Sequence, residues 1–129
     1  MASHSQPAQN YLGYMWADRG EHLEDALELV QKATQSHPQN AAYVDSLAWV
    51  LFKLDRPGEA LTEILKAVDL LEEPDPTVYD HLGDIQARLG EMDEAVQAWR
   101  KSYELDPTEA VRDKLEKAGQ PVPEKNPSD

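Results

Sequence analysis

The sequence YDHLGDIQARLGEMDEAVQAWRKSYELDP, residues 79–107, decides the fold of this chain. It holds two apolar patterns with helical spacing, which are separated by Gly90 and followed by Pro107. Related residues recur about 35 positions earlier and again about 35 positions before that, so that Leu82, Leu47 and Leu12 are equally spaced. A fixed period of this length indicates stacked helical hairpins, which build an extended surface rather than a catalytic pocket.

Other positions repeat with the same period, and most of them carry small or polar side chains. Apolar stripes between them predict seven helices, and no segment has the alternating pattern of a β-strand. The related residues are Asn10, Asp45 and Asp80; Gly13, Ala48 and Gly83; Ala26, Ala60 and Ala95; and Ala33, Ala67 and Ser102.

Composition restricts the classes of function. The 129 residues suit one domain, and the absence of cysteine excludes disulfides and thiolate chemistry. A formal net charge of −13 argues against binding to nucleic acids or anionic membranes. We find no signal peptide and no apolar run long enough to cross a bilayer, which predicts no membrane insertion. The sequence does not identify the compartment. We expect the cytoplasm if the chain is a full-length protein, and we assign no compartment if it is a fragment.

Residues 79–107 resemble a nearly complete tetratricopeptide repeat (TPR). In that motif the pair Leu82-Gly83 lets two helices approach closely, and Ala95 is the small residue where hairpins touch. Trp99 fills the large apolar site, and Pro107 ends the unit.

The other two units match the motif less completely. In the middle unit Ala48 replaces the glycine, Asp55 replaces the turn glycine, and Glu72 stands where proline would close the unit. The first unit keeps Gly13, but its turn between helices has one extra residue near Gly20.

The resemblance implies an all-α fold, an α-α superhelix of the TPR solenoid type, with three helical hairpins and a C-terminal capping helix. We expect a TPR domain over residues 7–119. Its repeats span about 7–40, 41–75 and 76–109, and the capping helix spans 108–119. Residues 1–6 and 120–129 are expected to be disordered.

The resemblance also implies a concave groove, lined by the first helix of each hairpin, that holds peptides. Its central aspartates would repel a C-terminal carboxylate, so we expect a basic or an apolar, aromatic peptide instead. Tyr14, Trp49 and Phe52 are the expected anchors. The alternative is that Trp49 packs against a neighbouring hairpin and the aspartates are merely solvated. The candidate groove residues are Asn10, Tyr14, Asp45, Trp49, Phe52, Asp80, His81, Asp84 and Arg88.

Other chemically capable residues favour structural roles. Trp16 and Trp99 lie on apolar stripes and are expected in the core. Clustered carboxylates stand at helix starts and turns, where negative charge is favourable. The four histidines lack the spacing of a zinc site. We therefore predict no metal, no cofactor and no enzymatic activity.

The sequence thus predicts a protein–protein interaction module that acts as an adaptor or scaffold. It resembles the sequences of bacterial TPR proteins. The alternative is a C-terminal fragment of a longer solenoid with a structural or self-associating role, including a homodimer through the N-terminal hairpin. A third interpretation is the accessory domain of an enzyme whose catalytic part lies outside these residues. Sedimentation separates a self-associating chain from a monomeric peptide-binding module.

Overall fold

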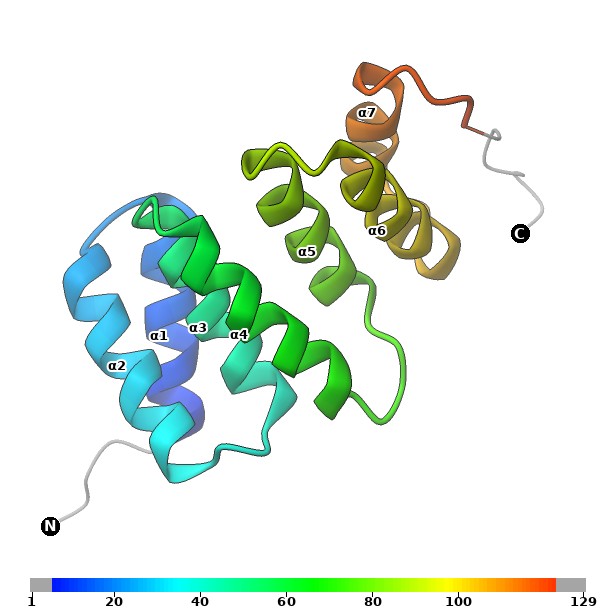
Figure 1. Cartoon of the computed structure of the whole chain (residues 1–129). Coiled ribbons are helices and arrows are strands. Elements are labelled where there is room, and N and C mark those ends of the chain that lie inside the picture. Colours follow the sequence, from blue (N-terminus) through cyan, green and yellow to red (C-terminus); the bar gives the residue numbers. More distant parts are fainter. Residues whose placement is uncertain (1–5, 123–129) are drawn as a thin grey trace, which may run out of the picture. The chain divides into compact units, whose positions relative to one another are not determined.

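The computed structural model describes residues 6–122, which form seven α-helices and no β-strand (Figure 1). The predicted all-α class is therefore confirmed for this part of the chain. The helices are α1 (Gln6–Arg19), α2 (Leu23–Ser36), α3 (Ala41–Lys53), α4 (Pro57–Leu70), α5 (Pro76–Arg88), α6 (Met92–Leu105) and α7 (Glu109–Lys117).

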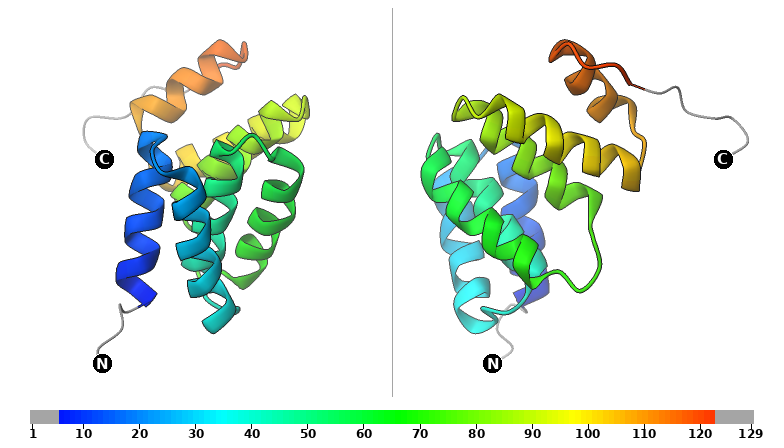
Figure 2. Two further views of the ribbon diagram at one scale, coloured as in Figure 1. Left: turned by 90° about the vertical axis from the view of Figure 1, so that its left-hand side faces the viewer. Right: turned by 45° about the vertical axis from the view of Figure 1, so that its right-hand side comes forward.

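The chain divides into two compact units, Met1–Glu72 and Glu73–Asp129. The first unit contains the hairpins α1–α2 and α3–α4, and α3 packs against both α1 and α2. In each hairpin the two helices run side by side in opposite directions (Figure 2). Small residues allow the close approach: Ala26 and Ala48 are fully buried, and a Cβ on Gly13 would lie 2.7 Å from Cγ1 of Val30.

The second unit contains the hairpin α5–α6, and α7 packs against α6. Its core joins Ala95 and Trp99 of α6 to Val111 and Leu115 of α7. The buried hydroxyl of Ser102 donates a hydrogen bond of 2.8 Å to the carbonyl oxygen of Pro76 and so ties α6 to the start of α5.

Helix starts follow the signals in the sequence. The side chain of Asn40, the expected N-cap of α3, accepts a hydrogen bond from the backbone N–H of Tyr43. Asp75 caps α5 and Thr108 caps α7 in the same manner.

The turns inside the hairpins require a left-handed backbone. Gly20 and Gly90 supply it at φ 70° and 80°, and Asp55 adopts φ 62° at the corresponding turn of the middle unit. The extra residue of the first turn is accommodated by a second left-handed residue, His22 at φ 49°. Since side chains other than glycine enter this region at a cost, Asp55 and His22 hold local strain.

Two predictions about the core have different outcomes. Trp99 is buried, as expected, with 5% of its surface exposed. Trp16 was expected in the core and is only half-buried, because it faces a cleft that residues of α1 and α2 alone line.

The expected domain boundaries stay predictions. Gln120 donates its backbone N–H to Leu115 and accepts a side-chain hydrogen bond from Arg100, and Val122 packs against the core of the second unit. Residues 1–5 and 123–129 of the expected disordered ends lie outside the described residues.

Candidate binding surfaces

The aromatic side chains of α3 form the centre of the candidate surface in the first unit. Trp49 and Phe52 are stacked with ring centroids 5.2 Å apart, and Nζ of Lys53 lies 5.0 Å from the centroid of the Trp49 ring. Trp49 is only 7% exposed, whereas Phe52 and Lys53 are half-buried. Phe52 is therefore the side chain of this stack that a ligand could cover, with Trp49 as its support.

Three further candidate groove residues lie in the same unit. Asp45 is buried on α3, and Tyr14 on α1 is half-buried. Oδ1 of Asn10 is buried and accepts no hydrogen bond in the described part of the chain. A buried acceptor without a donor is unfavourable, so a water molecule or a ligand N–H at this position would lower the free energy.

In the second unit, two candidate aspartates bind a lysine of the chain itself. Nζ of Lys114 on α7 donates to Oδ1 of Asp80 at 2.7 Å and to Oδ2 of Asp84 at 3.1 Å. Oδ1 of Asp84 accepts a further hydrogen bond of 3.2 Å from Nε1 of Trp99. The capping helix thus carries the counter-ion for the carboxylates of α5.

The pKa values in this network reflect burial and charge together. Burial raises the pKa of the Asp84 carboxyl, and the lysine opposes that rise. Burial also lowers the pKa of Lys114, but its bonds and charge interactions with Asp80 and Asp84 outweigh this effect, so the pKa is raised overall. The Asp84 carboxylate and the Lys114 ammonium group are thus partly removed from water and stabilise each other.

The sequence analysis did not single out Lys114 of the capping helix as a functional residue. Counted from the N-caps Asp75 and Thr108, Lys114 of α7 occupies the position of His81 in α5. The repeat alone therefore does not pair Lys114 with Asp80 or Asp84. His81 of α5 is buried and Arg88 at the end of that helix is exposed. All nine candidate groove residues remain predictions.

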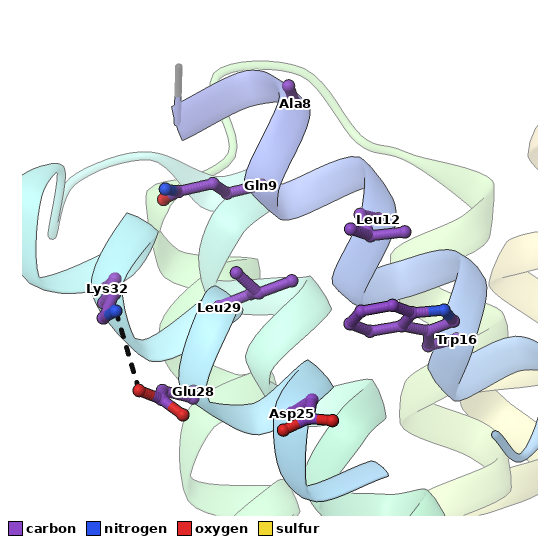
Figure 3. Close-up of a pocket in the computed structure, with 8 residues that line it drawn as sticks. All are labelled: Ala8, Gln9, Leu12, Trp16, Asp25, Glu28, Leu29 and Lys32. Atoms are coloured by element: carbon purple, nitrogen blue, oxygen red, sulfur yellow. Dashed lines mark ion pairs between the residues drawn. The ribbon is translucent and has the colours of Figure 1, made fainter. Parts of the chain in front are cut away.

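A second surface lies on the first hairpin. Its cleft, of about 360 Å³, is lined by residues of α1 and α2 only, and we call it the α1–α2 cleft (Figure 3). The ring of Trp16 and the side chains of Leu12 and Leu29 face this space, and Glu28 and Lys32 form an ion pair on the α2 side. The lining residues are Ala8, Gln9, Leu12, Trp16, Asp25, Glu28, Leu29 and Lys32.

Within residues 6–122, no group of three or more histidine, aspartate or glutamate side chains is arranged to hold a metal ion. No helix among these residues is both long and apolar enough to cross a membrane.

Two models of the tetratricopeptide repeat match the sequence, one over residues 17–77 and one over residues 76–109. The chain belongs to the TPR family. The matches cover the three hairpins apart from most of α1, and they confirm the resemblance seen in the sequence.

Similar proteins carry the same repeats. A TPR repeat-containing protein of Pseudomonas aeruginosa is 35% identical over 77 residues, which are 60% of this chain and 13% of that protein. The chain therefore matches only a small part of this relative's length.

Two solved TPR structures are similar to this one. The first TPR domain of Spaghetti (RPAP3), bound to an HSP90 peptide, has a TM-score of 0.79 and 20% identity. That likeness covers 92% of this chain and 94% of the other. A thermophilic TPR protein of Thermus thermophilus has a TM-score of 0.65 and 25% identity over 74% of this chain and 49% of its own. These likenesses confirm the fold class, an all-α TPR solenoid.

Proposed function

We propose that this TPR protein is an interaction module, an adaptor or scaffold that binds a peptide or a partner helix through α1 and α3, the first helices of the two hairpins in its first unit. Membership of the family supports binding rather than catalysis. A solved TPR domain of the same fold binds a peptide, which supports the same class of ligand here.

The observation that carries this proposal is the Trp49–Phe52 stack with Lys53 beside it. A half-buried aromatic ring held rigidly by a second ring loses little entropy when a ligand covers it. Aromatic side chains in such positions contribute strongly to binding. We therefore assign Phe52 as the main anchor on α3, with Tyr14 and Asn10 on α1 as further contacts.

Charge determines which peptide is preferred. The chain has a net charge of −13, against which Lys53 is a single cation at the stack. Asp45 lies one helical turn before Trp49 on α3 but is buried. A basic or apolar, aromatic peptide meets less repulsion here than an acidic one. We propose that Lys114 reduces this acidity at α5, because it already binds Asp80 and Asp84.

The test is a titration with two probe peptides. One is SRMEEVD, the peptide bound by the RPAP3 domain, and the other is a peptide of equal length rich in lysine and tyrosine. We expect measurable binding of the basic peptide only, and a loss of about tenfold or more in its affinity in Phe52→Ala. Leu65→Ala, which alters an exposed leucine of α4, is the matched control. Tight binding of SRMEEVD, or equal binding by Phe52→Ala, would contradict the proposal.

A second candidate function is structural, with the chain acting as one part of a larger assembly. It is supported by the exposed side chains of Tyr11 and Leu12 on α1 and by the α1–α2 cleft beside them. Such an apolar surface favours association with a further hairpin or a second copy. Sedimentation velocity over a range of concentrations tests self-association: a dimer that Leu12→Asp abolishes supports it, and a monomer throughout contradicts it.

A further inference from the structure

Helix α1 has apolar side chains on more than the face that it packs against the rest of its unit. Gly13 and Ala17 are buried, whereas Tyr11 and Leu12 are 66% and 38% exposed. Trp16 is half-buried beside them. A helix that is apolar on several sides is normally covered on several sides. The exposed side of α1 is therefore suited to a contact outside its own unit.

The α1–α2 cleft has the dimensions and walls of a helix-docking site. Trp16 and Leu12 form one wall and Leu29 the other, with open space between them (Figure 3). The volume of about 360 Å³ accommodates a few large apolar side chains, the number that one face of an amphipathic helix presents in two turns.

Charges on α2 determine what kind of helix fits. Asp25 and Glu28 lie at the cleft, and Lys32 is its only cation among the residues that line it. Lys32 pairs with Glu28 at 3.6 Å, but both side chains are more than half exposed, so this pair contributes little. The cleft is thus apolar with an acidic edge, and basic side chains complement it.

A second copy of the chain fits the α1–α2 cleft less well than a basic helix. It would bring the same Asp25 and Glu28 to the interface, together with its own net charge of −13.

We propose that the α1–α2 cleft binds an amphipathic helix of another polypeptide, with large aliphatic side chains on one face and lysine or arginine along its flanks. The aliphatic face covers Leu12, Trp16 and Leu29, and the basic flank lies against Asp25 and Glu28. This site is separate from the candidate groove residues, and a foreign helix in it is an alternative to the self-association that the second candidate function describes.

The experiment uses a synthetic four-turn helix with leucine on one face and lysine on its flanks. Its matched probe has glutamate in place of every lysine. Binding to the whole chain is measured by calorimetry and by the emission of Trp16, which unlike Trp49 and Trp99 is not buried. We expect the lysine helix to bind at least tenfold more tightly than the glutamate helix, with a change in tryptophan emission.

Two pairs of variants distinguish the cleft from general attraction to an acidic protein. Leu12→Asp should lower affinity for the lysine helix at least tenfold, and Leu65→Asp, at another exposed leucine, should not. Asp25→Lys with Glu28→Lys should reverse the preference between the two helices. Glu72→Lys with Glu73→Lys alters net charge equally at exposed residues outside the cleft and should preserve the preference.

Equal effects of both charge-reversed pairs would show non-specific attraction and overturn the proposal. A concentration-dependent dimer that Leu12→Asp abolishes would assign the cleft to a second copy and would also overturn it. Neither result concerns the peptide titration of Phe52→Ala, so the first proposed function is tested independently.

Discussion

Replacing Gly83 with alanine should destabilise the chain, although alanine is the better helix former. A Cβ at this position would lie 2.9 Å from Cε2 of Trp99 and still closer to Nε1 and Cδ1. The ring cannot move away freely, because it is 5% exposed and its Nε1 donates to Asp84. Since real Cβ atoms essentially never make contacts this short, the crowding costs about 2–3 kcal/mol, the upper part of the usual range. Alanine returns up to about 1 kcal/mol through helix propensity.

We therefore expect Gly83→Ala to lower the free energy of unfolding by about 1–2 kcal/mol. Urea unfolding followed by far-UV circular dichroism measures it. The matched control is Gly58→Ala in α4, where a Cβ meets no atom within 4 Å. That variant should gain about 0.5 kcal/mol, because alanine loses less backbone entropy on folding.

A double variant tests the mechanism directly. The middle unit has Ala48 and Ile64, both fully buried, at the positions of Gly83 and Trp99. Combining Gly83→Ala with Trp99→Ile recreates that pair. The double variant should therefore lose less free energy of unfolding than the two single variants together, by about 1 kcal/mol or more. Strict additivity, or a Gly83→Ala variant as stable as the parent chain, would refute the reasoning.

Three further predictions concern charge and backbone strain. Lys114→Met should lower the free energy of unfolding by about 1–3 kcal/mol, because it leaves two partly buried carboxylates without their cation. In the same urea assay, the control Lys117→Met should alter the free energy of unfolding by less than about 0.5 kcal/mol. Since the pKa of Lys114 is raised in the folded chain, its contribution to stability should be fully present below the ordinary pKa of 10.5 and should be lost as the pH rises past that value. The difference in free energy of unfolding between the parent chain and Lys114→Met should therefore shrink above this pH. A difference that stays constant with pH would contradict this prediction. Asp55→Gly should stabilise the chain by about 0.5 kcal/mol through relief of its left-handed backbone, and Asp55→Val should destabilise it by more than about 1 kcal/mol, as thermal unfolding can check.

The sequence predicted the helices and their pairing because the repeat places the same physical constraints at equal intervals. The TPR resemblance implied that Gly83 allows two helices to approach closely and that Trp99 fills the large apolar site. The structure adds that these two residues lie against each other. The turn at Asp55 was also recognised, since it stands where glycine supplies a left-handed backbone in the other units.

The surfaces were harder to predict from the sequence. Whether Trp16 is buried depends on which helices lie beside α1, and helical spacing alone does not contain that information. The partnership of Lys114 with Asp80 and Asp84 joins residues 30 or more positions apart through a flexible side chain. Similarly, Trp49 and Phe52 lie one turn apart on α3, yet only Phe52 keeps substantial exposure.

The position of Lys114 has a consequence for anyone who shortens this chain. A cut after the third repeat, at Pro107, looks neutral on a motif map because it keeps every repeat intact. It would nevertheless strip Val111 and Leu115 from the last hairpin and leave Asp80 and Asp84 without the cation that the structure provides. A shortened chain would therefore have two additional unpaired carboxylates on its surface. Basic proteins that bind to it could be held by these carboxylates, which Lys114 occupies in the native molecule.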